Sequence, residues 1–147
     1  MGFLRRLSPT LGFLAIGVVA CHHAKSESRP QPAGGTPLVG TEWTLVELGG
    51  QPAGLGAGEK PATLSLSEAD KHASGFAGCN RMSGTYELAG STLRFGPMAV
   101  TRMACATGMD LETRFLAVLE ATRGYRLAAE GLELTGEAGT LARFAHQ

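Results

Sequence analysis

Three cysteines carry most of the potential chemistry of this 147-residue chain. Cys21 directly follows an apolar segment, Leu11–Ala20, and Arg5 and Arg6 lie ahead of that segment. A basic flank followed by an apolar run and small residues is typical of an export leader. The sequence therefore predicts that residues 1–20 are a lipoprotein signal peptide. Cys21 would then be lipidated through its sulfur and become the first residue of the mature protein.

Two other interpretations of this leader are weaker. The ten apolar residues cover only about half of the roughly 20 helical residues that a membrane span needs. An ordinary secretory leader would leave an unpaired cysteine beside the cleavage point, for which we see no physical reason. The Arg5–Arg6 pair also lacks the surrounding residues of a twin-arginine export signal.

The residues after Cys21 predict where the protein is held. His22 stands where many diderm bacteria place the aspartate that retains lipoproteins in the inner membrane. We therefore expect an outer-membrane lipoprotein that faces the periplasm and touches the membrane through its lipid anchor. Residues 21–37 are rich in Ser, Pro, Gly and charged groups, which predicts a flexible tether. His22 and His23 are interpreted as solvated tether residues, so no metal site is expected there.

Cys79 and Cys105 remain once Cys21 is lipidated. An exported domain lies in an oxidising compartment, where a disulfide between the two is the default expectation. Two alternatives stay open at this point. Both cysteines could be inert free thiols, or Cys79 could be a nucleophile whose pKa is lowered by Arg81. The interpretation of Cys79 as a nucleophile lacks a histidine in a recognisable partner position.

Composition and motifs exclude several classes of function. The 13 basic and 13 acidic residues balance, so no net charge steers the protein towards nucleic acid. No nucleophile elbow, phosphate-binding loop or zinc-binding histidine pair is found, and the glycine-rich residues 54–58 lack the Lys-Ser/Thr of a phosphate loop. We therefore expect neither catalysis nor a cofactor, and we expect a monomer.

Apolar residues alternate with polar ones in most of residues 38–147, which predicts short strands. One segment differs, because Leu111, Phe115, Leu116 and Leu119 recur every three to four residues and predict an amphipathic helix over about 110–122. Thr107 and Asp110 suggest a capping box for this helix, and Gly124 its end. The fold class expected is α+β and mainly β, a small antiparallel sheet or barrel with one packed helix. Strands are expected at 40–48, 62–67, 83–88, 92–95, 98–103, 125–128, 132–135 and 140–144.

Three segments together resemble the META domain family, to which HslJ-like envelope lipoproteins belong. They are GFAGCNRMSGTY at 75–86, LRFGPMA at 93–99 and TRMAC at 101–105. The resemblance extends to WTL at 43–45 and to the helix, and so covers about residues 38–144. It implies a compact antiparallel β structure with a packed helix. It also implies a bacterial envelope protein linked to stress and antibiotic tolerance, in a family without a defined biochemical activity.

Four polar residues beside the two cysteines form a candidate binding patch: Asn80, Arg81, Thr101 and Arg102. Two arginines on adjacent corners suit the recognition of a carboxylate or phosphate. We therefore expect a non-catalytic module that binds an envelope protein or acts in envelope stress. The alternative is a carrier or sensor of a small apolar ligand, such as a lipid, held between the sheet and the helix face of Leu111, Phe115 and Leu119.

Overall fold

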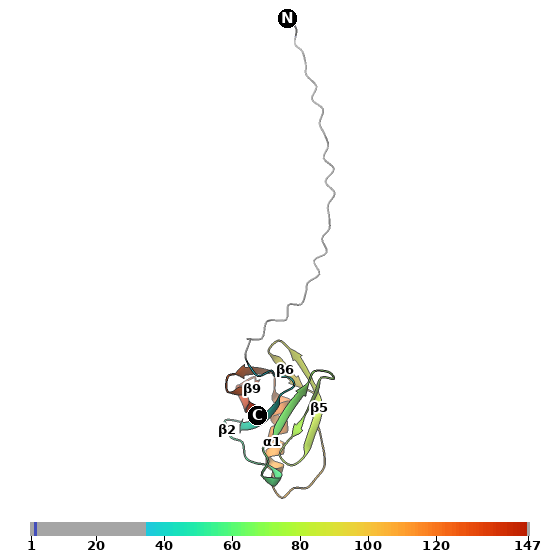
Figure 1. The fold of residues 1–147 in the computed structure, drawn as a ribbon, viewed down its shortest axis with the longest axis vertical. Coiled ribbons are helices and arrows are strands. Elements are labelled where there is room, and N and C mark those ends of the chain that lie inside the picture. Colours follow the sequence, from blue (N-terminus) through green and yellow to red (C-terminus); the bar gives the residue numbers. More distant parts are fainter. Residues whose placement is uncertain (1, 3–34, 147) are drawn as a thin grey trace.

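The computed structural model describes Gly2 and residues 35–146 of the chain. The expected lipidation site Cys21 lies outside the described residues, as do the expected leader apart from Gly2 and all of the tether before residue 35. Figure 1 shows the domain that these residues form. It contains a ten-stranded antiparallel sheet, one α-helix and a single turn of 3-10 helix. The strands are β1 (Glu42–Leu48), β2 (Gln51–Pro52), β3 (Thr63–Ser67), β4 (His72–Phe76), β5 (Arg81–Ala89), β6 (Thr92–Phe95), β7 (Ala99–Val100), β8 (Gly124–Ala128), β9 (Gly131–Gly136) and β10 (Gly139–His146), and the helices are η1 (Ala57–Glu59) and α1 (Met109–Ala121).

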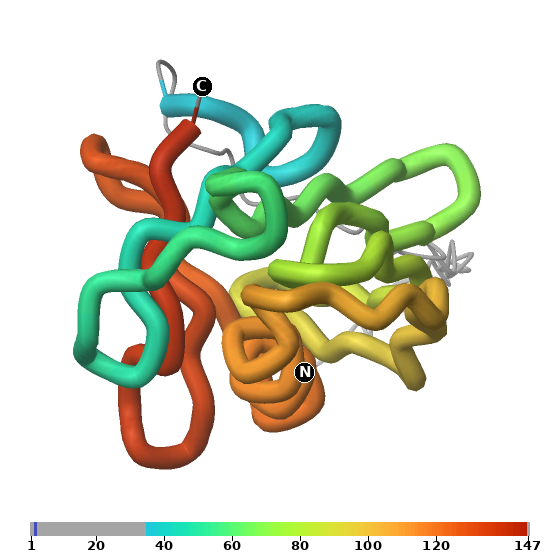
Figure 2. Tube along the Cα trace, turned by 90° about the horizontal axis from the view of Figure 1, so that it is seen from below, coloured from blue at the N-terminus to red at the C-terminus, as the bar shows by residue number. Residues whose placement is uncertain are grey.

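Eight of the strands close into a barrel. Their order is β10-β9-β8-β6-β5-β4-β3-β1, and β1 also pairs with β10 to complete the ring. The expected α+β, mainly β class is therefore confirmed. The weakest seam is between β6 and β8, which share the single pair Thr92 and Gly124. Figure 2 shows α1, in orange, between the red C-terminal strands and the yellow segment that contains β6.

The core lies inside the barrel and under the helix. Alternating residues of the strands point inwards, as the period of two predicts. Phe115 of α1 is fully buried, and its ring packs against that of Phe144 with centroids 5.9 Å apart. The helix therefore closes the barrel with its apolar face. The other large and fully buried side chains are Trp43, Leu64, Leu66, Leu93, Leu119, Leu132 and Leu134.

Several expected boundaries need correction. The helix spans Met109–Ala121, and its N-cap is Gly108 in a left-handed conformation, without a side-chain cap from Thr107. Gly124 belongs to β8 and does not cap the helix. Of the strand expected at 98–103, only Ala99 and Val100 form β7. Beyond them the backbone N–H of Thr101 still donates to the Arg81 oxygen on β5, but the Thr101 hydroxyl and the Met103 N–H donate to the Asn80 side chain.

Strand β4 was absent from the sequence-based prediction. Its sequence HASGF has little apolar alternation, since the inward positions hold only Ala73 and Gly75. The position of Gly75 must be small. A Cβ on Gly75 would lie 2.0 Å from the backbone oxygen of Thr63 on the neighbouring strand β3. Close packing of these strands therefore explains the lack of a hydrophobic signal.

Candidate functional site

The two cysteines of the domain form a disulfide. Cys79 and Cys105 have Cα atoms 5.9 Å apart, and their bond ties the turn between β4 and β5 to the loop that follows β7. A disulfide sulfur has no thiol proton and is not a nucleophile. The interpretation of Cys79 as a catalytic thiol is therefore not realised in this structure, nor is that of free thiols.

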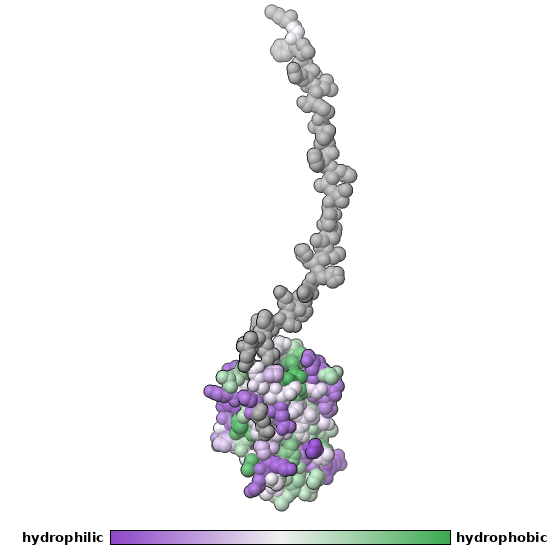
Figure 3. All heavy atoms as spheres, viewed as in Figure 1, coloured by the Kyte–Doolittle hydropathy of each residue, from purple (hydrophilic) through white to green (hydrophobic). Residues whose placement is uncertain are grey.

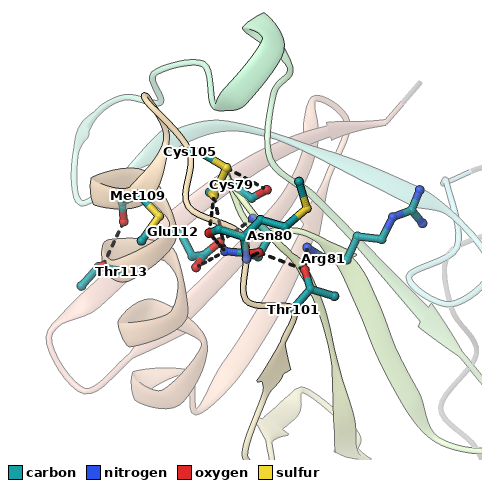
Figure 4. Close-up of a disulfide and its surroundings, with 9 residues drawn as sticks. Cys79, Asn80, Arg81, Thr101, Cys105, Met109, Glu112 and Thr113 are labelled. Atoms are coloured by element: carbon teal, nitrogen blue, oxygen red, sulfur yellow. Dashed lines mark hydrogen bonds between the residues drawn. A yellow bond between two sulfur atoms is a disulfide. The ribbon is translucent and has the colours of Figure 1, made fainter.

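Asn80 lies at the centre of this corner and is only 3% exposed. Its side-chain oxygen accepts hydrogen bonds from the backbone N–H of Met103 (2.7 Å) and from the hydroxyl of Thr101 (3.0 Å). Its Nδ2 donates to the backbone oxygen of Met103 (3.3 Å). Figure 4 shows Asn80 among these partners, with the disulfide to one side. The side chain thus holds the 101–105 loop in place.

Glu112 of α1 completes the corner from the opposite side. It is buried, and its carboxyl oxygens accept hydrogen bonds from the backbone N–H (2.6 Å) and the Nδ2 (3.1 Å) of Asn80. Glu112 does not belong to the apolar repeat of the helix, so the helical pattern did not predict its burial. An interior carboxyl group requires hydrogen-bond donors, and Asn80 supplies two of them.

Two glycines allow this helix to approach so closely. Gly78 has φ +127° and Gly108 has φ +90°, both in the region that favours glycine. A Cβ on Gly108 would lie 2.2 Å from the backbone oxygen of Gly78. That oxygen also accepts a hydrogen bond from the backbone N–H of Ala57 at 2.6 Å. The start of α1, the β4–β5 turn and η1 therefore meet backbone to backbone.

The four residues of the expected binding patch are two pairs of neighbours that the structure brings together, but they do not all lie at the surface. Arg81, Thr101 and Arg102 are exposed, whereas Asn80 is buried beneath them. The hydroxyl of Thr101 accepts a hydrogen bond from the backbone N–H of Arg81 at 3.2 Å. In Figure 4 the Arg81 side chain extends away from Asn80 and its hydrogen-bond partners. The corner thus presents cationic side chains on a rigid support.

An open groove of about 960 Å³ lies beside this corner on the outer face of the barrel. Its floor is formed by outward residues of β3, β4 and β5, and its lining includes Phe76 and the disulfide. Lys60, Pro61, Thr101 and Met103 also line it. Met103 is 64% exposed. This groove was not predicted from the sequence.

The floor of the groove holds three serines in register. Ser65 pairs with Ser74, and Ser74 pairs with Ser83, across three adjacent strands. These serines recur at every ninth residue, a spacing that was visible in the sequence. Within residues 35–146, their hydroxyls make no hydrogen bond to another group of the protein. They are therefore available to a ligand.

The space between the sheet and the helix is filled by side chains. Phe115 and Leu119 are fully buried and Leu111 is 6% exposed. A second open groove of about 670 Å³ lies outside this core, between the helix residues Leu116 and Ala117 and the segment that contains Pro97 and Met98. The surface seen in Figure 3 intersperses hydrophilic and hydrophobic residues.

Three ionisable groups elsewhere in the barrel have pKa values that differ from their ordinary values. A hydrogen bond from Ser67 lowers the pKa of Asp70 in the β3–β4 turn. Burial raises the pKa of Tyr86, whose hydroxyl donates to the backbone oxygen of Ser67. Hydrogen bonds to Glu133 and Glu47 raise the pKa of Arg143 on the outer face of β10.

Within the described residues, no group of three or more His, Cys, Asp or Glu side chains is placed to hold a metal ion. No helix in the same part of the chain has both the length and the apolar character for a membrane span.

Comparisons with known proteins agree with this architecture. A protein from Burkholderia xenovorans, solved by NMR, is 32% identical with a TM-score of 0.61 over 85% of this chain and 97% of that chain. A second NMR structure is 27% identical with a TM-score of 0.55 over 71% of this chain and 87% of that chain. No curated protein matched the sequence. The model of the META domain family matches residues 36–147, and the chain therefore belongs to the META domain family.

Proposed function

We propose that this protein is a lipid-anchored component of the bacterial envelope whose META domain binds another envelope component without catalysing a reaction. The anchor rests on the sequence pattern before Cys21. The binding role rests on one observation, the cationic corner that opens onto the 960 Å³ groove. Tolerance of envelope stress would follow from this binding.

The corner is suited to binding because it is rigid and its charge is unpaired. The disulfide and the hydrogen bonds of Asn80 fix the loop that carries Thr101 and Arg102. In the part of the chain that the structure describes, no carboxylate lies within ion-pair distance of Arg81 or Arg102. A preorganised site loses little entropy when its partner binds.

The interior of the domain favours this proposal over a carrier of a small apolar ligand. A carrier needs space between the sheet and the helix. Phe115 and Leu119 occupy that space and are fully buried, and Phe115 packs on Phe144. An apolar ligand would have to displace part of the core, at the cost of its close packing.

The anchor is tested by Cys21→Ser, with Ser26→Ala as the control substitution in the tether. We expect Cys21→Ser to remain an unprocessed precursor without incorporated lipid, and Ser26→Ala to be processed like the wild type. Radiolabelled palmitate and membrane fractionation measure both properties. Normal processing and lipid labelling of Cys21→Ser would contradict the anchor.

The binding role is tested with a photo-crosslinking amino acid in place of the exposed Met103, and in place of Arg126 on β8 as a control. We expect a discrete crosslinked product in intact cells from position 103 alone. Arg81→Ala and Arg102→Ala should weaken this capture without lowering Tm, because both side chains are exposed. Equal products from both positions, or none from position 103, would contradict a specific binding role for this corner.

A further inference from the structure

We propose that the groove beside the disulfide is a binding site for an acidic oligosaccharide. This inference rests on the proposed binding function and names the chemical class of its ligand. It assigns a sugar ring to Phe76, sugar hydroxyls to the serine row formed by Ser65, Ser74 and Ser83, and a carboxylate to Arg81.

The serine row provides regularly spaced hydroxyl groups. Neighbouring strands lie about 4.8 Å apart, so the row offers one hydroxyl per strand at a spacing close to the length of a pyranose ring. A hydroxyl both donates and accepts a hydrogen bond, as a sugar hydroxyl does. The row crosses the strands from Ser65 to Ser83 and so follows the groove floor.

Phe76 lies in the next outward row of the same floor. It pairs with Thr63 on β3 and with Arg81 on β5. Its ring is half-buried in the lining of the groove. An aromatic face beside polar groups is the arrangement in which the apolar face of a sugar ring is removed from water.

The charges of the groove favour an acidic sugar in one orientation. Arg81 and Lys60 both line it, and no carboxylate of residues 35–146 forms an ion pair with either. A guanidinium binds a carboxylate through two parallel hydrogen bonds. Glu42 pairs with Ser65 at the β1 end of the serine row and would repel a carboxylate there. The carboxylate therefore belongs at Arg81, with the sugar hydroxyls towards Glu42.

The same geometry disfavours an extended peptide. Peptides that bind to sheets add a strand to an open edge or place side chains in apolar grooves. Here the floor is a sheet face, and the backbone groups of β4 already pair with β3 and β5. Phe76 is the one aromatic residue of the lining. Among the polar side chains of the lining, hydroxyls and cations predominate, and Glu42 is the one carboxylate.

Isothermal titration calorimetry of the full-length protein in mild detergent tests the proposal. The probes are tetragalacturonate, a peptidoglycan tetrasaccharide with muramic carboxylates, neutral chitotetraose and the acidic peptide tetraglutamate. We expect one or both acidic glycans to bind more tightly than chitotetraose and tetraglutamate. The two acidic probes distinguish a uronic acid from a muramic acid as the source of the carboxylate.

Substitutions locate the binding to the groove. Arg81→Gln should weaken the acidic glycan by about tenfold, the effect of one lost charge-assisted contact. Arg94→Gln, an exposed arginine on β6, is the matched control and should leave affinity unchanged. Ser74→Ala should weaken both acidic and neutral glycans, and Ser91→Ala in the β5–β6 turn should not. Equal melting temperatures would show that each variant is folded.

Three results would overturn the proposal: no binding of either acidic glycan, tighter binding of tetraglutamate, or equal losses in Arg81→Gln and Arg94→Gln. None of these results bears on the lipid at Cys21. A protein that is lipidated and crosslinks at position 103 but binds no glycan would retain the proposed function and lose this inference.

Discussion

Asn80 and Glu112, 32 positions apart in the sequence, are joined by two hydrogen bonds inside the domain. One donor is the backbone N–H of Asn80 and the other is its side-chain amide. The pair connects the β4–β5 turn to the first turn of α1. Because Asn80 also holds Met103, the helix, the turn and the loop of the disulfide form one rigid unit.

Glu112→Gln should destabilise the domain by about 1–3 kcal/mol. A glutamine keeps one acceptor oxygen, so one N–H of Asn80 loses its partner and faces another N–H group. Urea denaturation of Glu112→Gln and of Glu120→Gln, an exposed position on the same helix, measures the effect. A similar small change in both variants would show that the Asn80–Glu112 contact contributes little.

Gly108→Ala should destabilise the domain by about 3 kcal/mol or more, because conformational strain and a steric clash add. The new Cβ would lie 2.2 Å from the Gly78 oxygen at φ +90°. Gly90 has φ +60° with open space around it, so Gly90→Ala isolates the conformational cost, about 1–2 kcal/mol. Thermal unfolding followed by circular dichroism compares them. If Gly108→Ala melts no lower than Gly90→Ala, the close contact between the Gly108 and Gly78 backbones does not limit the stability of the domain.

The sequence predicted the barrel class because its strands alternate clearly and its helix has a different period. Helix residues Phe115 and Leu119 were identified as an apolar face and are fully buried. Strand β4 was missed because small residues replace apolar ones where strands pack closely. Its absence from the prediction also hid the serine row, since Ser74 lies on β4.

The candidate site was predicted only in part for a related reason. The cysteines and the arginines were recognisable by type, and the disulfide is present in the structure. Asn80 was included in the predicted binding patch, but its side chain is buried, where its amide group bonds to Glu112 and Met103. The burial of Glu112 depends on a partner 32 positions away, and helical periodicity alone carries no information about such a contact.

The carboxyl group of Asp70 should titrate below its ordinary value of 3.8, because the Ser67 side chain donates a hydrogen bond to it. A lowered folded pKa contributes stability above the unfolded value, and this contribution is lost as pH falls through the folded pKa. Ser67→Ala should return the Asp70 pKa towards 3.8, while Ser65→Ala on the same strand should not. Side-chain carboxyl NMR across acidic pH measures both, and an unchanged pKa in Ser67→Ala would contradict the assigned cause.

Removing the disulfide should destabilise the domain by about 3–4 kcal/mol, since Cys79 and Cys105 close a loop with a separation of 26 residues. The double variant Cys79→Ser/Cys105→Ser should show this loss in urea denaturation. Addition of a reductant should lower the stability of the wild type and leave the double variant unchanged. The loop of residues 101–105 is also held by Asn80, so the reduced domain should still fold and keep part of its groove. Equal stability of oxidised wild type and double variant would show that Asn80 and Glu112, rather than the disulfide, maintain this corner.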